Sequence, residues 1–154
     1  MSQYRRYRVN GATYFFTVNL AQRHSQLLVQ NVGILREAYR KMMLESPLQV
    51  DAFVVLPDHI HAIWTLPQGD HDYSSRWRKF KARFSHAVPT QPRTSFSKQR
   101  KRERGIWQRR FWEHMIRDED EFAALMTYCQ ENPVKHGFVA DARDWPYSSF
   151  NTRT

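Results

Sequence analysis

Two apolar segments of strand-like composition, 49–55 and 59–66, are separated by only three residues, Leu56-Pro57-Asp58. Proline and aspartate in so short a link are typical of a turn. We therefore expect the two segments to pair as an antiparallel hairpin. A hairpin at this place favours an α+β fold with a mainly antiparallel sheet.

Other segments predict two more strands and three helices around the hairpin. Residues 13–20 are rich in β-branched and aromatic side chains, and 107–116 alternate bulky with polar ones, so both are predicted strands. Apolar residues at three-to-four spacing predict helices at 31–46, 74–87 and 118–132. The resulting order of elements is closest to a ferredoxin-like split βαβ motif with helices packed on the sheet.

The last of these helices carries a signal at each end. Asp118 followed three residues later by Glu121 is a capping-box pattern, which marks a helix start. Pro133 disfavours helical geometry in the residue before it. We therefore expect this helix to end near Asn132.

The basic charge of the chain is concentrated in one segment. The chain has 24 Lys and Arg against 15 Asp and Glu, and residues 76–110 contain thirteen of the basic residues but only one acid. Such a segment predicts a polyanionic partner, with nucleic acid first and an anionic membrane surface second. The alternative is a solvated basic loop that aids solubility. The portion at about 89–104 has little to bury, and we expect it to be mobile until DNA binds.

The candidate DNA-binding residues are cations of this segment together with three others nearer the ends of the chain. They are Arg5, Arg6, Arg76, Arg78, Lys79, Lys81, Arg83, Arg100, Lys101, Arg102, Arg104, Arg109, Arg110 and Lys135.

Length and composition exclude several classes of protein. The 154 residues fit a single domain spanning 1–154. A lone cysteine, Cys129, excludes an intrachain disulfide framework and any multi-cysteine zinc site. The longest apolar run, 52–56, is far shorter than the roughly 20 residues that cross a bilayer. We therefore expect a cytoplasmic protein.

A His-x-His pattern stands in the second hairpin strand. Because side chains alternate along a strand, His59 and His61 share one face, opposite a face formed by Ile60, Ala62 and Trp64. Their Cα atoms are about 7 Å apart, so both imidazoles can bind one divalent cation. The same pattern also fits two structural histidines that bond to their neighbours, and the pattern alone leaves both interpretations open.

The helix at 118–132 can bring two further groups to that face. Tyr128 and Asn132 are four residues apart and therefore lie one turn above the other, beside the apolar stripe of the helix. Packed on the histidine face, they would supply a nucleophilic phenol and a metal-binding amide oxygen, which suits metal-assisted cleavage of a phosphodiester. An ordinary half-buried tyrosine and a helix-ending asparagine are the alternatives.

Four blocks of the sequence match the pattern of one family. They are Leu56-Pro57-Asp58-His59-Ile60-His61-Ala62, Trp107-Gln108-Arg109-Arg110-Phe111-Trp112-Glu113-His114, Tyr128-x-x-x-Asn132-Pro133-Val134-Lys135-His136-Gly137 and Asp144-Trp145-Pro146-Tyr147-Ser148-Ser149-Phe150. In these blocks the chain resembles the REP-associated tyrosine transposases, bacterial single-tyrosine members of the HUH endonuclease superfamily.

The resemblance implies an enzyme that cleaves and rejoins single-stranded DNA at REP-type hairpins through a 5′-phosphotyrosine intermediate. It implies that Tyr128 is the nucleophile and that His59, His61 and Asn132 bind Mg²⁺ or Mn²⁺. It also implies a nucleoid-associated protein that works as a monomer, with a dimer as the alternative. It assigns no role to Glu113, His114 or His136.

Two other functions fit the residues. A non-catalytic hairpin-binding protein, such as a repressor, would need the basic segment but neither metal nor Tyr128. A zinc hydrolase would use the histidine pair and a water molecule, and would need neither Tyr128 nor DNA.

Overall fold

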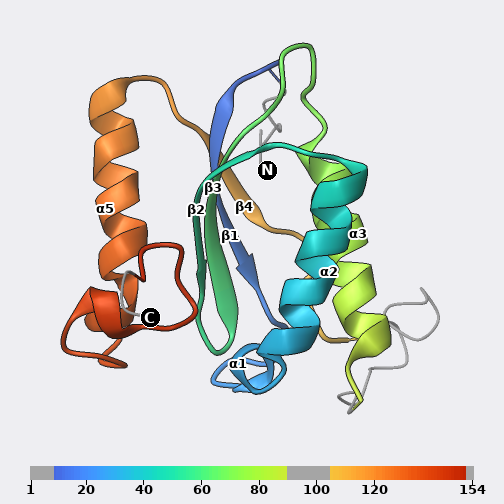
Figure 1. Ribbon diagram of the computed structural model, residues 1–154, viewed down its shortest axis with the longest axis vertical. Helices are drawn as coiled ribbons and strands as arrows, with labels where there is room; N and C mark the ends of the chain where they lie inside the picture. The colour runs from blue at the N-terminus through green and yellow to red at the C-terminus, as the bar shows by residue number, and fades with distance from the viewer. Residues whose placement is uncertain (1–8, 90–104, 152–154) are drawn as a thin grey trace, which may run out of the picture.

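The computed structural model describes residues 9–89 and 105–151, in which a β-sheet of four strands lies between two layers of helices (Figure 1). The strands are β1 (Thr13–Asn19), β2 (Gln49–Val55), β3 (His59–Thr65) and β4 (Trp112–Met115). The helices are α1 (Leu27–Gln30), α2 (Val32–Glu45), α3 (Tyr73–Ala87), α5 (Glu119–Lys135) and the short 3₁₀ helix η1 (Ala142–Asp144).

The sheet has the order β2-β3-β1-β4, and every neighbouring pair is antiparallel. The connections through α2 and α3 both lie on one face of the sheet, whereas α5 covers the other face (Figure 1). Strand, helix, two strands, helix and strand in this arrangement form the ferredoxin-like split βαβ motif. The predicted fold class is therefore confirmed.

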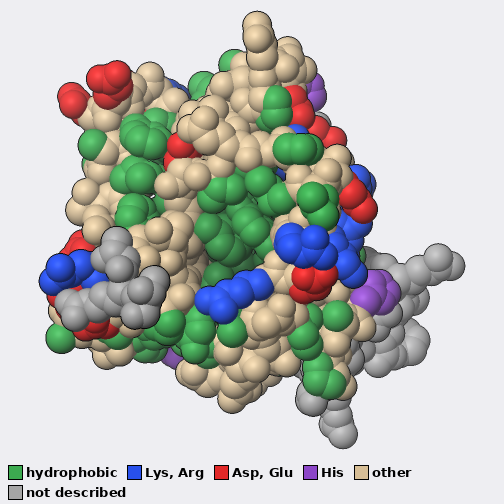
Figure 2. Space-filling model, in the orientation of Figure 1, with side chains coloured by type: hydrophobic (Ala, Val, Ile, Leu, Met, Phe, Trp, Pro, Cys, Tyr) green, Lys and Arg blue, Asp and Glu red, His purple; other side chains and the backbone are tan. Residues whose placement is uncertain are grey.

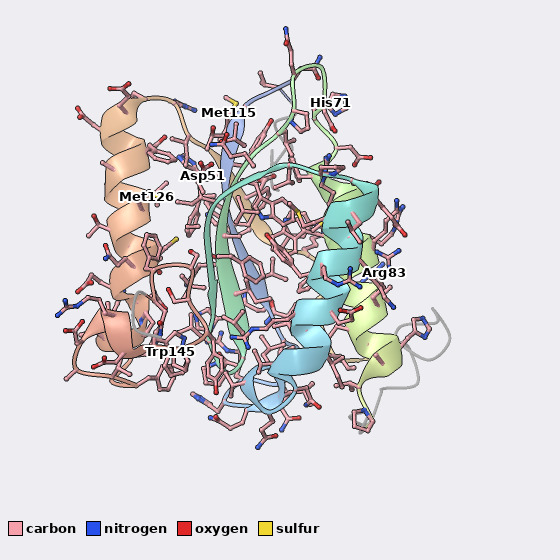
Figure 3. The ribbon with its side chains drawn as sticks, in the orientation of Figure 1. Asp51, His71, Arg83, Met115, Met126 and Trp145 are labelled. Atoms are coloured by element: carbon pink, nitrogen blue, oxygen red, sulfur yellow. The ribbon has the colours of Figure 1, made fainter. Side chains whose placement is uncertain are left out.

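Alternation along β3 sends its side chains into two separate cores. Ile60, Ala62 and Trp64 are buried in the cluster beneath α2 and α3, and Ile63 belongs to the cluster beneath α5. Met126 of α5 packs against this second cluster from the α5 side (Figure 3). The two histidines of β3 share the face of Ile63 and are therefore covered by α5.

The strand predicted at 107–116 is shorter in the structure. Only Trp112–Met115 pairs with β1 as a strand. Trp107 forms an isolated bridge with Leu20 and buries its ring against α3, so the chain between Trp107 and β4 leaves the sheet. The single turn of α1 was not predicted from the sequence pattern.

The prediction that the last helix ends near Asn132 is wrong, because α5 continues through Pro133 to Lys135. A proline in a last turn removes one backbone donor, but the following residues can still bond backward. The amide of His136 donates to the carbonyl oxygen of Asn132 at 3.1 Å. The helix ends instead at Lys135, and the chain turns away at Gly137, whose φ of 77° glycine adopts readily.

The start of α5 is capped as predicted, although the capping box is not reciprocal. The Asp118 carboxylate accepts a hydrogen bond from the Glu121 amide at 2.8 Å. The Glu121 carboxylate accepts from the amide of Arg117 rather than Asp118, and its other oxygen lies 2.8 Å from Nε2 of His114. The side chain that would close the box thus connects α5 to β4.

Arg76 is a correction to the predicted DNA-binding set. Its side chain is buried in α3 and donates hydrogen bonds to the carbonyl oxygens of Ser46, Pro47 and Asp72 and to the Asp70 carboxylate. These bonds use the guanidinium to join α3 to the end of α2 and to the loop before α3. Arg76 is therefore a structural residue, which its charge alone does not reveal.

We expect Arg76→Gln to lower the free energy of unfolding by about 3 kcal/mol, because it removes a buried guanidinium from a partly buried ion pair and leaves carbonyl oxygens without donors. Urea unfolding followed by circular dichroism measures this loss. Arg78→Gln is the matched control, since Arg78 is exposed on the same helix and its loss should change stability by no more than about 0.5 kcal/mol. Equal stabilities of the two variants would contradict the structural role of Arg76.

Several predictions concern residues outside those that the structure describes. The segment predicted to be mobile, 89–104, lies outside them except for Pro89. The same is true of the candidate cations Arg5, Arg6, Arg100, Lys101, Arg102 and Arg104. Across the part of the chain that is described, no helix is long and apolar enough to cross a lipid bilayer.

Candidate active site

His59 and His61 lie side by side on β3, under the carboxyl-terminal half of α5. Both side chains are buried, and their ring centroids are 4.9 Å apart with the rings nearly perpendicular. The predicted placement on one face of the strand is confirmed. Two imidazoles this close can direct one nitrogen each toward a common cation.

Each histidine is held through its Nδ1 atom by a polar side chain. Nδ1 of His59 lies 2.7 Å from a carboxylate oxygen of Asp58, and Nδ1 of His61 lies 2.9 Å from the hydroxyl oxygen of Thr17. These bonds leave Nε2 of each ring as the nitrogen available to a ligand. Metal-binding histidines in proteins are typically oriented in this way by a carboxylate or another polar partner.

The environment favours neutral imidazoles, which are the form that binds metals. Burial lowers the pKa of His61 to about 3, and the neighbouring His59 and His136 add to this effect. Burial also lowers the pKa of His59, against the opposing effect of Asp58. Burial alone would raise the pKa of Asp58, but hydrogen bonds from His59, the His24 amide and Arg23 outweigh it and lower the pKa to about 2.

Tyr128 projects from α5 toward this pair. Its ring centroid lies 5.2 Å from that of His61 and 5.9 Å from that of Phe15, both in edge-to-face contact. Tyr128 is nevertheless 39% exposed as a residue, so a substrate can reach it. The ammonium nitrogen of Lys135 lies 5.3 Å from the ring centroid, and this places a positive charge beside the phenol.

Asn132 lies one helical turn after Tyr128 and is almost completely buried. Tyr128 contacts His61, while His136, one turn after Asn132, contacts His59 with ring centroids 5.4 Å apart. Asn132 therefore lies on the side of α5 that faces the histidines. Its amide oxygen and nitrogen are both buried and have no hydrogen-bond partner within the described residues.

The unpartnered amide fits a metal-binding role. A buried polar side chain without a partner costs free energy unless a ligand or water satisfies it. No group of three His, Cys, Asp or Glu side chains that could hold a metal ion occurs in the described ranges 9–89 and 105–151. The side chain of Asn132 can supply an amide oxygen as a third ligand to a cation held by His59 and His61.

Three residues of this site had no assigned role in the sequence analysis: Thr17, Asp58 and His136. Asp58 belongs to the predicted turn, and its position directly before His59 is the local signal for its role in the site. Thr17 is brought to His61 by the pairing of β1 with β3, which no local pattern reveals. His136 contacts His59 because α5 continues past Pro133.

Glu113 and His114, which the sequence left without a role, point to opposite faces of β4. Glu113 is paired with Phe16 and is buried on the α2–α3 side. His114 lies on the α5 side and bonds to Glu121, so it fixes β4 to the start of α5. Neither residue is the β4 partner of Thr17, the residue that pairs with His61 on β3.

The cations of α3 form a second group, away from the histidines and over the α2–α3 layer, where Figure 2 shows Lys and Arg beside acidic side chains. Arg83 and Lys79 form ion pairs with Glu45 of α2, and Lys81 donates to the carbonyl oxygen of Gln108. Four other candidate cations are exposed. They are Arg78, Arg109, Arg110 and Lys135.

In this site, two histidines on a strand of a ferredoxin-like sheet face a tyrosine on a helix. This arrangement defines the HUH class of tyrosine enzymes. Comparison with known proteins agrees. The chain is 47% identical over 151 residues to the REP-associated tyrosine transposase of Escherichia coli strain K12. The aligned region covers 98% of this chain and 84% of the relative. A relative from Haemophilus influenzae assigned to the same family is 44% identical over 153 residues, or 98% of this chain and 86% of the relative.

The chain belongs to the REP-associated tyrosine transposases. A solved structure of one such transposase bound to a REP hairpin is 47% identical and superposes with a TM-score of 0.86, covering 97% of this chain and 83% of the other. A crystal structure of a transposase-like protein from Deinococcus radiodurans, 20% identical with a TM-score of 0.50, shares the fold and covers 83% of this chain and 95% of its own. No family model matches the sequence.

Proposed function

We propose that this transposase is a metal-dependent endonuclease and strand transferase that acts on single-stranded DNA at REP-type hairpins through a 5′-phosphotyrosine intermediate. One observation carries the proposal: an accessible Tyr128 contacts His61 one turn before a buried amide, Asn132, that lacks a partner in the described part of the chain. The relative that was solved with a REP hairpin supports the choice of DNA.

In the proposed cleavage step, the phenol oxygen of Tyr128 attacks the scissile phosphorus and forms a new P–O bond. The bond from phosphorus to the 3′ oxygen breaks, so the DNA strand leaves with a free 3′-hydroxyl and its 5′-phosphate stays on Tyr128. The phenol proton passes to solvent, and the departing 3′ oxygen takes up a proton. Attack by a 3′-hydroxyl on the phosphotyrosine reverses these changes and rejoins two strands.

His59, His61 and Asn132 are the residues that would hold Mg²⁺ or Mn²⁺. When bound, the cation supplies Lewis-acid polarisation of the phosphate oxygens. Asp58 and Thr17 keep the two imidazoles in the required orientation through their Nδ1 atoms. The burial of the pair keeps both rings neutral and free to donate a lone pair from Nε2.

The site also supports a monomer that acts in cis. Tyr128 contacts His61 of its own chain, so nucleophile and histidines meet without exchange of α5 between two copies. Exposed cations near the site, among them Lys135 and Arg110, would neutralise phosphates of the bound strand.

A covalent-adduct assay tests the proposal. A single-stranded REP hairpin with flanking nucleotides is incubated with the protein and Mn²⁺, and a DNA–protein band is sought in a denaturing gel. We expect the band with Mn²⁺ and its loss with a chelator. Salt-sensitive binding that persists with chelator, without any covalent product under either condition, would instead indicate the non-catalytic hairpin-binding protein.

We expect Asp58→Asn to weaken Mn²⁺ binding about 10- to 100-fold, because an amide holds the His59 ring less firmly than a carboxylate and lowers its basicity. Isothermal titration of the metal-free protein with Mn²⁺ measures the loss. Asp51→Asn is the control, since Asp51 accepts hydrogen bonds from Gln49 and Thr65 at the far end of the hairpin. Unchanged Mn²⁺ affinity in Asp58→Asn would contradict this orienting role.

A further inference from the structure

Trp112 is aligned across the sheet with one of the two histidines, His61. β3, β1 and β4 are neighbouring strands, and in their register His61 pairs with Thr17, which pairs in turn with Trp112. Directly paired residues of antiparallel strands point to the same face. Trp112 therefore projects from the face that carries His61, and two strand spacings put their backbones roughly 10 Å apart.

Trp112 is unusually exposed for a tryptophan on a strand. The residue is 56% exposed, whereas Trp64 and Trp77 of the α2–α3 core are fully buried. The reason is its position on β4, at the edge of the sheet, while α5 packs over β2 and β3. An exposed large aromatic ring on the catalytic face thus continues the site toward this edge.

The charge next to Trp112 favours a polyanion. Arg109 and Arg110 come shortly before it in the chain and are both exposed. The acidic residue that follows, Glu113, is buried on the opposite face of the sheet. Proteins that bind single-stranded nucleic acid commonly combine aromatic rings with cations, because bases stack on the rings and phosphates bind to the cations.

We propose that Trp112 is the stacking platform for an unpaired base of the single-stranded segment next to the scissile phosphate, with Arg109 and Arg110 on the adjoining phosphates. This inference rests on the proposed function and names where the flanking strand lies. A DNA strand whose scissile phosphate lies at Tyr128 and His61 would reach Trp112 by crossing β1 toward β4, the edge strand of the sheet. Since stacking accepts every base, the platform contributes affinity for unpaired DNA rather than recognition of one sequence.

Binding to two oligonucleotides tests the proposal, with fluorescence anisotropy measured in chelator so that cleavage does not interfere. One oligonucleotide is a REP hairpin stem alone, and the other is the same stem with single-stranded flanks. We expect Trp112→Ala to bind the flanked hairpin about 5- to 150-fold more weakly, the range of one base–aromatic stack, and the bare stem as the wild type does. Trp112→Phe should keep most of the affinity, and Trp112→Leu should lose it.

Leu44→Ala is the matched control, because Leu44 is also exposed but lies on α2, across the sheet from the histidines. Equal binding of the flanked hairpin by wild type and Trp112→Ala would overturn the platform while leaving the proposed cleavage intact. An equal loss on both oligonucleotides would also overturn it, since the contact would then be to the stem or to the fold. Absence of binding by the wild type to either oligonucleotide would overturn the proposed function together with the platform.

Discussion

Tyr128→Phe is expected to abolish DNA cleavage and the covalent DNA–protein adduct while leaving hairpin binding unchanged. The substitution removes only the oxygen that forms the phosphotyrosine bond. Phenylalanine keeps the ring that packs edge-to-face on His61 and Phe15, and it keeps the contact with Lys135. The fold of α5 and the metal-binding side chains should therefore be the same in the variant.

The expected loss is large, because removal of the nucleophile from a covalent catalyst lowers turnover by up to roughly 10⁶-fold. Adduct formation in a denaturing gel and strand cleavage with a labelled hairpin both measure it. Tyr147→Phe is a suitable control, since Tyr147 packs against Trp145 and Arg36 away from the histidine pair. Cleavage that survives Tyr128→Phe would point to the zinc hydrolase, in which water rather than the phenol attacks.

Local periodicity explains how much of this site could be predicted from the sequence. Alternation along one strand is enough to put His59 and His61 together, opposite Trp64. A spacing of four residues is enough to put Tyr128 and Asn132 on one side of a helix. Both statements involve residues within a single element, where backbone geometry determines which side chains are neighbours.

What the sequence did not show depends on contacts between distant segments. Thr17 meets His61 only because of the register between β1 and β3, which are separated in the chain by two helices and strand β2. Arg76 has the same charge as Arg78 on the same helix. Arg76 is buried and hydrogen-bonded to carbonyl oxygens, whereas Arg78 is exposed. Charge patterns predict a partner, whereas burial decides which cations can reach it.

The same reasoning applies to Pro133. The rule that proline disfavours a preceding helical residue predicted the end of the helix at Asn132. In the structure, packing of α5 on the sheet buries Cys129, Asn132 and Pro133 together, and this burial stabilises the final turn. Tertiary packing therefore outweighs a local backbone preference, and the extra turn is what brings His136 to His59.

His61→Ala is expected to lower metal-dependent cleavage by about 10³-fold, because the cation would lose one of its two imidazole ligands and with it several kcal/mol of transition-state stabilisation. Affinity for the hairpin in chelator should stay within about twofold of the wild type, since phosphate contacts come from cations outside the pair. The two measurements separate loss of chemistry from loss of DNA binding.

His61 is buried against Phe15 and bonds to Thr17, so a stability measurement belongs with this test. Thermal unfolding identifies any general loss of the fold, and titration with Mn²⁺ shows whether metal affinity falls in the folded variant. His71→Ala is the control, because His71 is exposed in the loop before α3 (Figure 3) and should change neither metal affinity nor cleavage. If His61→Ala remained folded and bound Mn²⁺ as tightly as the wild type, the cation would have to lie elsewhere, and the unpartnered amide of Asn132 would need another ligand.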